Sequence, residues 1–321
     1  MLIKRAKIIF FILSIFRFSS SSNCAKDKHS DKFKARNKTL SNHNKVLTVL
    51  NFKQYLSAMS NMRLVIRYLQ FLIRSKTKYD IHSPFIYQFI TDVLEDARHF
   101  YAFDEIEYAR EILMQDETII EVIDQGAGSR KLKSPGRKIS DIAATSLTNR
   151  KFGELLFRMV NYYQLKNILE LGTSLGISAL YFAKANRDVH VTTIEGSPAI
   201  ADRARQVFKT WGHDQIHLIN AEFSAGLEQL EIGNDKFDLI YIDGNHQKQP
   251  TLDYFYKLKE KHSTTDTIFI FDDIHWSSEM EAAWKIIQND KSVTATIDLF
   301  FKGLVFLNTG LHAKQHISFK Y

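Results

Sequence analysis

The sequence predicts an α/β protein whose C-terminal half contains a doubly wound, mostly parallel sheet of seven strands. Short β-rich runs alternate with helix-like segments from residue 167 onward, a pattern typical of parallel strands joined by helices. The last two strands have no helix between them and therefore predict a terminal antiparallel hairpin. The expected strands are 168–171, 189–195, 216–220, 237–243 and 267–271, followed by the hairpin strands 293–299 and 304–307.

Residues 61–150 predict a helical N-terminal subdomain, and residues 151–321 the sheet domain. Ser83 can cap a helix that has Pro84 at its first position. A flexible loop is expected at 124–138, because this segment combines glycine and proline with five basic side chains. The loop is either a lid that meets an anionic substrate or a plain solvated linker. The expected helices are 63–73, the segment that begins at Pro84, and 103–114.

The positive charge of the chain is concentrated near its N-terminus. The 321 residues have a net charge of +7, but residues 1–76 hold 16 Lys and Arg against 2 Asp and Glu, which leaves 27 basic and 34 acidic residues for the rest. The predicted sheet domain therefore lacks the basic footprint of a nucleic-acid-binding surface. Nucleic acid is disfavoured as a partner, except through the basic N-terminal segment.

Residues 1–60 are expected to be a disordered extension, or to precede the true translation start at Met59 or Met62. Much of this segment is Ser, Asn and Lys, which cannot bury enough apolar surface to offset the entropy of folding. Its apolar run 8–16 is too short to span a bilayer, and the single cysteine, Cys24, excludes an internal disulfide. We expect a cytoplasmic protein without a transmembrane span, and a homodimer is an open alternative.

Two glycines after the first predicted strand indicate a cofactor site. At the carboxyl end of a parallel strand, glycine lets the backbone approach a ligand, and the next helix offers free amides. Three residues separate Gly172 from Gly176, whereas a dinucleotide-binding turn needs Gly-x-Gly-x-x-Gly, so NAD is disfavoured. Glu195 ends the second strand, where a carboxylate can accept both hydroxyls of a ribose. The alternative is an incidental surface glutamate.

Three aspartates follow the fourth and fifth predicted strands. Because neighbouring strands lie about 5 Å apart, Asp243, Asp272 and Asp273 should converge beside the cofactor. Crowded carboxylates raise one another's pKa unless a cation lies among them, and Mg²⁺ or a similar hard ion fits an all-oxygen site. The alternative for Asp272 is a helix cap, although Ser278 and Glu281 already form a capping box there.

The segment 169–180, LELGTSLGISAL, resembles motif I of the catechol, caffeoyl-CoA and macrocin-type O-methyltransferases, which are class I S-adenosylmethionine-dependent methyltransferases. The resemblance covers roughly residues 150–310 and implies a Rossmann-like methyltransferase fold. It also implies that the glycine turn and Ser178 hold the methionine part of the cofactor, that Glu195 binds its ribose, and that 220–223 contacts adenine. The expected cofactor-binding residues are Glu170, Gly172, Thr173, Ser174, Gly176, Ser178, Glu195, Ala221, Glu222 and Asp243.

Methyl transfer to oxygen requires an acceptor hydroxyl that is deprotonated near neutral pH. A metal that binds the hydroxyl lowers its pKa, and a nearby base removes the proton. Catechol-type enzymes have a lysine base three residues after the strand-four aspartate, and here that position holds His246, as in the macrocin-type enzymes. We expect Asp243 and His246 to be catalytic and Asp243, Asp272 and Asp273 to bind the metal. A hydrogen-bonding or metal-binding role is the alternative for His246.

These features predict transfer of a methyl group from S-adenosylmethionine to a hydroxyl oxygen of a small acceptor, with the help of a divalent metal. One alternative is methylation of a hydroxylated tRNA base, and another is a non-catalytic cofactor-binding interaction module. His275 is expected to have a packing role, and Trp276 to wall the acceptor or to belong to the core. No motif identifies the acceptor, because acceptor pockets in this fold come from N-terminal helices and loops.

Overall fold

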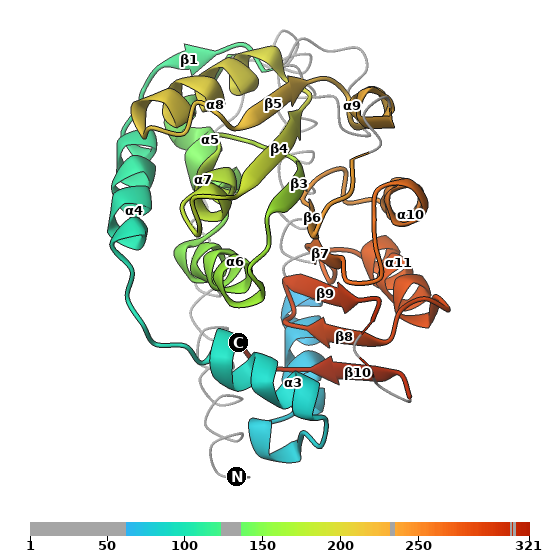
Figure 1. Cartoon of the computed structure of the whole chain (residues 1–321). Helices are drawn as coiled ribbons and strands as arrows, with labels where there is room; N and C mark the ends of the chain where they lie inside the picture. Colours follow the sequence, from blue (N-terminus) through green and yellow to red (C-terminus); the bar gives the residue numbers. More distant parts are fainter. Residues whose placement is uncertain (1–61, 123–135, 232–234, 309, 311–312) are drawn as a thin grey trace, which may run out of the picture. The chain divides into compact units, whose positions relative to one another are not determined.

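The computed structural model describes residues 62–122, 136–231, 235–308, 310 and 313–321, so the predicted extension 1–60 lies outside the described residues. Asn61–Tyr321 forms one compact unit, in which helices cover both faces of an eight-stranded sheet (Figure 1). The predicted α/β class is confirmed. The strands are β3 Asn167–Leu171, β4 His190–Glu195, β5 His217–Asn220, β6 Leu239–Ile242, β7 Ile268–Asp272, β8 Ala295–Asp298, β9 Lys302–Phe306 and β10 Gln315–Ser318.

The strand order of the sheet is β10-β8-β9-β7-β6-β3-β4-β5. β3 pairs in parallel with β4 on one side and with β6 on the other, so the direction of winding reverses between β3 and β6. The predicted hairpin is confirmed, because β9 pairs antiparallel with both β8 and β7. The prediction of seven strands was wrong by one, because β10 extends the sheet in parallel with β8.

Two hydrophobic clusters lie on opposite faces of the sheet. Successive strand residues point to opposite faces, so Ile168 belongs to the cluster under α6, α7 and α8, whereas Leu169 belongs to the cluster under α9, α10 and α11. Figure 1 shows these helix groups on either side of the sheet. The helices are α6 Arg150–Tyr163, α7 Ile177–Ala183, α8 Pro198–Thr210, α9 Phe223–Glu231, α10 Lys248–Lys261 and α11 Ser278–Asn289.

The predicted N-terminal helices are present and contribute Ile86, Phe89 and Phe103 to the first of these clusters. Ser83 caps α3 as predicted, with its Oγ accepting a hydrogen bond of 3.4 Å from the Ile86 amide. Among the described residues, no helix combines the length and hydropathy needed to cross a bilayer. The observed elements are helix 62–74, η1 Lys78–Asp80, α3 Pro84–Phe89, η2 Ile90–Leu94, α4 Tyr101–Met114 and α5 Ile139–Ser146.

The predicted loop 124–138 lies mostly outside the described residues. Its C-terminal end is not loop, because β2 (Arg137–Lys138) pairs antiparallel with β1 (Ile119–Ile120). A two-residue strand is shorter than the pattern that a sequence reading can detect.

Candidate active site

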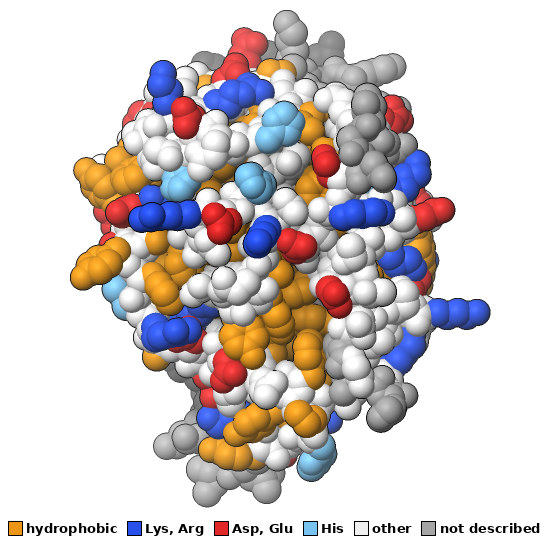
Figure 2. Space-filling view, in the orientation of Figure 1, with side chains coloured by type: hydrophobic (Ala, Val, Ile, Leu, Met, Phe, Trp, Pro, Cys, Tyr) orange, Lys and Arg blue, Asp and Glu red, His pale blue; other side chains and the backbone are white. Residues whose placement is uncertain are grey.

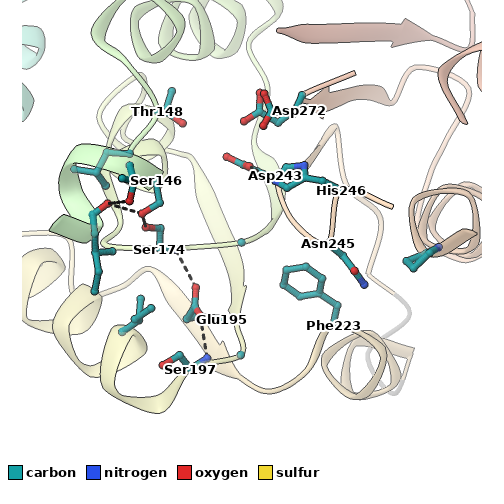
Figure 3. Close-up of a pocket in the computed structure, with 18 of the residues that line it drawn as sticks. Ser146, Thr148, Ser174, Glu195, Ser197, Phe223, Asp243, Asn245, His246 and Asp272 are labelled. Atoms are coloured by element: carbon teal, nitrogen blue, oxygen red, sulfur yellow. Dashed lines mark hydrogen bonds and ion pairs between the residues drawn. The ribbon is translucent and has the colours of Figure 1, made fainter. Parts of the chain in front are cut away.

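A cavity of about 1030 Å³ opens at the carboxyl ends of the central strands. It lies where the winding reverses, which is the usual ligand site of open α/β sheets. Figure 3 shows Ser174, Glu195 and Ser197 in one part of the cavity and Asp243, Asp272 and His246 in another. The predicted site residues that line the cavity are Gly172, Ser174, Glu195, Glu222, Asp243, His246, Asp272 and Asp273.

Gly172 brings the backbone of the β3 turn against the backbone that follows β6. The Asp243 amide donates a hydrogen bond of 2.8 Å to the Leu171 carbonyl. A Cβ on Gly172 would lie 1.9 Å from the Asp243 carbonyl oxygen, and the φ angle of Gly172 is +104°. Because only glycine combines this φ angle with this close approach, Gly172 is required for the two strand ends to meet.

Two backbone amides, one on either side of the carboxylate, hold the Glu195 side chain in place. Its Oε2 accepts a hydrogen bond of 3.0 Å from the Ser174 amide, and its Oε1 accepts one of 2.9 Å from the Ser197 amide (Figure 3). Burial raises the pKa of Glu195, and these backbone hydrogen bonds oppose the rise. Each carboxylate oxygen keeps a lone pair for another donor, so Glu195 can accept two hydroxyls from a ligand in the cavity.

Some predicted cofactor-binding residues shape the turn but do not line the cavity. The Thr173 and Thr193 hydroxyls share a hydrogen bond of 2.6 Å in the interior. A Cβ on Gly176 would lie 2.4 Å from the Phe208 ring, so this glycine allows close packing of the start of α7. The predicted residues outside the lining are Glu170, Thr173, Gly176, Ser178 and Ala221.

Glu170 is a fully buried carboxyl on β3. Thr193 donates a hydrogen bond of 2.6 Å to Glu170 Oε2. Burial raises the pKa of Glu170 to about 7, although hydrogen bonds from Ser178 and Thr193 favour the ionised form. The carboxyl is therefore close to half-protonated at neutral pH, and its ionisation is coupled to folding.

We expect protein stability to fall as the pH rises from 4.5 to 7 because Glu170 ionises. Its pKa in the folded state lies above the ordinary value of 4.5, so the folded state binds the proton more tightly than the unfolded state. The stabilisation is complete below pH 4.5 and is lost through pH 7, a change of about 3 kcal/mol. Urea unfolding across this range should show a flatter profile for Glu170→Gln, which cannot ionise. An unchanged profile, matching that of the exposed-site control Glu228→Gln, would contradict the prediction.

The predicted convergence of the three aspartates is confirmed. Ile242 of β6 pairs with Phe271 of β7, and Asp243 and Asp272 come directly after these two residues. Asp273 lines the same cavity. Burial and then the charge of Asp272 raise the pKa of Asp243 well above its ordinary value, and the same two causes raise the pKa of Asp273. Burial opposes ionisation of Asp272 too, but the nearby Lys302 ammonium lowers its pKa.

Lys302, which sequence analysis did not single out, lies beside these carboxylates. Its Nζ donates a hydrogen bond of 2.8 Å to Asp272 Oδ1 and one of 2.6 Å to the Tyr241 hydroxyl. Tyr241 in turn donates a hydrogen bond of 2.7 Å to Asp243 Oδ2. A continuous set of hydrogen bonds therefore links the ammonium to both aspartates.

The arrangement does not fit the predicted divalent metal. Asp272 Oδ1 and Asp243 Oδ2 are already bonded to Lys302 and Tyr241, and an ammonium beside them repels a second cation. Over the part of the chain that the structure describes, no group of three or more His, Cys, Asp or Glu side chains is arranged to hold a metal ion. A lysine ammonium lies beside the carboxylates for which the sequence predicts a cation.

His246 lies on the loop after β6, at the part of the cavity that holds the aspartates (Figure 3). Its Nε2 is 3.8 Å from Asp243 Oδ1. Asn245, His246 and Asp273 have φ angles of +63°, +25° and +53°. Such conformations cost about 1–3 kcal/mol each for residues other than glycine and often occur at functional sites. The strained backbone holds the imidazole and the carboxylates around one space.

His275 links α11 to β8, in keeping with its predicted packing role. Its ring lies between Asp298, at 2.8 Å from Nε2, and Glu281, at 3.1 Å from Nδ1, and it stacks on Phe300. Trp276 is 60% exposed and does not line the cavity, so neither role expected for it is observed. The predicted Ser278 cap is also wrong, because Ser277 caps α11.

Phe223, the last residue of the segment 220–223 that is expected to contact adenine, lines the cavity and packs edge-on against Tyr254. Sequence analysis missed other lining residues, which carry no motif. Thr148 and Phe152 reach the cavity from the loop before α6 and from α6 itself. Their place depends on helix packing, which no local pattern reports.

Comparison with known proteins gives a match for the segment that supplies most of the residues lining this cavity. Residues 169–274 match the family model of the methyltransferase domain. A "Putative O-methyltransferase" of Mycobacterium sp. (strain JLS) is 28% identical over 138 residues, which cover 42% of this chain and 61% of that protein. The catechol O-methyltransferase of Niastella koreensis is 34% identical over 106 residues, which cover 32% of this chain and 47% of that protein.

Similar solved structures include the SAH-bound methyltransferase PaMTH1 of Podospora anserina. It is 17% identical, with a TM-score of 0.49, and the match covers 71% of this chain and 98% of that chain. The matched segments span less than two thirds of the two curated relatives. The family match and both curated relatives nevertheless agree on one class. Residues 169–274 therefore resemble a methyltransferase domain, and the chain is similar to O-methyltransferases.

Proposed function

We propose that this protein transfers the methyl group of S-adenosylmethionine to a hydroxyl oxygen of a small acceptor. One observation carries the proposal: the Gly172 turn and Glu195 line the same cavity as Asp243 and His246. A cofactor seated on the first pair would direct its reactive end toward the second pair. The methyltransferase family match of this segment agrees with that use of the cavity.

The cavity suits S-adenosylmethionine in three respects. Glu195 offers two carboxylate oxygens to the ribose hydroxyls while its own orientation is set by the Ser174 and Ser197 amides. Gly172 lets the turn after β3 meet the backbone after β6, so that both line the space proposed for the methionine part. Phe223 offers an aromatic surface near the predicted adenine contacts, Ala221 and Glu222.

The bound cofactor supplies an electrophilic methyl group on a sulfonium. His246 takes the proton of the acceptor hydroxyl, and the oxygen forms a bond to the methyl carbon as the sulfur–carbon bond breaks. The sulfur keeps the electron pair of that bond, so the products are a methyl ether, S-adenosylhomocysteine and a protonated imidazole that later releases its proton. Asp243 lies beside this imidazole, with its Oδ1 3.8 Å from Nε2 of the ring.

Metal assistance, which the sequence predicted, is not part of this mechanism. Mg²⁺ needs several oxygen ligands in near-octahedral geometry at about 2.0–2.1 Å, but the Lys302 ammonium lies 2.8 Å from Asp272 Oδ1 and repels a second cation placed among these carboxylates. The residues of the site therefore do not fit the ion as they lie.

A cytoplasmic location and a homodimer stay predictions.

A small acceptor is favoured over tRNA by the charge pattern on the face of the protein that Figure 2 draws. Figure 2 shows Lys and Arg side chains interspersed with Asp and Glu on the face drawn, and no continuous basic area appears there. A tRNA-binding face needs such an area to neutralise phosphates. A purely non-catalytic module is disfavoured because His246 and Asp243 remain together beside the cofactor space.

Calorimetry tests the proposal through its cofactor. We expect the purified full chain to bind S-adenosylmethionine and not NAD. Glu195→Ala should weaken this binding by about 100-fold, because two hydrogen bonds to a charged group are lost. The matched control is Glu228→Ala, since Glu228 is exposed and lies outside the cavity. Equal affinity of the Glu195→Ala and wild-type proteins would reject the assignment, as would tight binding of NAD.

A further inference from the structure

We propose that Lys302 is the built-in cation of the acceptor site and that methyl transfer by this protein needs no metal ion. The inference rests on the proposed function and adds to it the group that balances charge where the acceptor oxygen reacts. It comes from a cluster of contacts around one buried lysine.

Lys302 is held from several directions. It begins β9 and pairs directly with Asp272 of β7, so the two side chains lie on the same face of the sheet. The residue is 3% exposed. Its Nζ lies 5.3 Å from the centre of the Phe152 ring and 4.8 Å from that of the Tyr241 ring, at distances typical of cation–π contacts. This ammonium is therefore fixed in place, unlike the mobile end of a surface lysine.

A lysine that is buried this deeply needs partners that stabilise its positive charge. An isolated ammonium costs several kcal/mol to remove from water, so a buried lysine needs charged or strongly polar partners. Asp272 provides the opposite charge at 2.8 Å, and the Tyr241 hydroxyl accepts a second hydrogen bond. The lysine in turn stabilises the aspartates, because its positive charge offsets the repulsion between Asp272 and Asp243.

Lys302 can also act on the acceptor itself. An ammonium has three N–H donors, and Asp272 and Tyr241 accept two hydrogen bonds from it. Lys302 lines the cavity together with His246 and Asp273. The third N–H is therefore available to an acceptor oxygen, where a positive charge stabilises the developing negative charge as His246 takes the proton.

Metal binding is tested directly, without an assay of catalysis. After exhaustive treatment with a chelator, the full chain is titrated with Mn²⁺, and electron paramagnetic resonance measures the free ion. We expect no Mn²⁺ binding that depends on Asp272, so wild type and Asp272→Asn should give the same titration. A submillimolar Mn²⁺ site that Asp272→Asn removes would overturn the proposal, whether or not the acceptor is known.

Stability tests the pairing of Lys302 with Asp272. Lys302→Met leaves a buried carboxylate without its cation, and we expect the Tm to fall by roughly 6–20 °C. The double variant Lys302→Met/Asp272→Asn removes both charges and should regain much of that loss. The matched control is Lys259→Met, which breaks the ion pair with Asp290 outside the cavity. If the double variant is as unstable as the sum of the two single variants, the lysine does not balance the cluster.

Activity measurements then separate the proposed role of Lys302 from the proposed methyl transfer itself. With the acceptor found by screening, wild type should turn over equally in chelator and in Mg²⁺. Lys302→Met should bind S-adenosylmethionine with wild-type affinity but lose about 100-fold in kcat, and the double variant serves in its place if the single variant does not fold. Full activity of the lysine variant, or loss of wild-type activity in chelator, would overturn the role of Lys302. Absence of cofactor binding by wild type would instead overturn the proposed function.

Discussion

Replacing Gly172 with alanine is expected to abolish S-adenosylmethionine binding and to destabilise the protein by about 3 kcal/mol or more. The new Cβ would lie 1.9 Å from the Asp243 carbonyl oxygen, and backbone atoms cannot move aside as a flexible side chain would. The φ angle of +104° adds a cost for any residue with a Cβ. Relief of the clash would separate the ends of β3 and β6, which together form the floor of the cavity. Thermal unfolding and calorimetry with the cofactor measure the two effects.

Gly212→Ala is the matched control for this change. Gly212 also has a positive φ angle, +72°, but a Cβ there would have no atom within 4 Å. It should therefore show only the conformational cost of about 1 kcal/mol and normal cofactor affinity. If both alanine variants bind the cofactor equally well, the close approach at Gly172 does not shape the binding site.

Replacing His246 with alanine is expected to lower kcat by about 10²–10⁴-fold. The imidazole is the proposed acceptor of the hydroxyl proton, and its Nε2 lies 3.8 Å from Asp243 Oδ1. The affinity for S-adenosylmethionine should stay within a few fold of wild type, because Glu195, the proposed ribose ligand, lies in a different part of the cavity (Figure 3). Steady-state kinetics with an acceptor from a screen, together with cofactor calorimetry, measure the two quantities.

His190→Ala is the control for the histidine prediction. His190 is exposed and begins β4, so it lies at the end of the strand opposite to Glu195. Its replacement should leave kcat and cofactor affinity unchanged. A loss of cofactor affinity in His246→Ala that equals its loss of kcat would assign the imidazole to binding and would contradict its role as the base.

The strand-end residues of the site could be predicted because each signal is local. Gly172 and Glu195 stand at the ends of apolar β-rich runs, and in a parallel sheet those ends meet at one edge. The same reasoning predicts that Asp243 and Asp272 lie close together, and the pairing of β6 with β7 confirms it. Glycine spacing distinguished the turn from a dinucleotide-binding one.

The cation of the site could not be predicted, because its place depends on long-range strand pairing. Lys302 is 61 residues from Tyr241 and 30 from Asp272 in sequence. It reaches both only because β9 inserts between β8 and β7 with a register that sets Lys302 opposite Asp272. A shift of one residue would turn the lysine to the other face of the sheet. The sequence therefore predicts a cation among the aspartates and names a metal ion, whereas the structure places a lysine beside them.

The sequence by itself determined the α/β class, the glycine turn and the acidic strand ends, because periodicity and strand-end chemistry are properties of neighbouring residues. Only the tertiary structure decided which residues share one cavity, how Glu170 came to be fully buried, and that a lysine lies among the aspartates. Burial and charge pairing are set by contacts between distant segments, and these contacts form only when the sheet and its helices pack together.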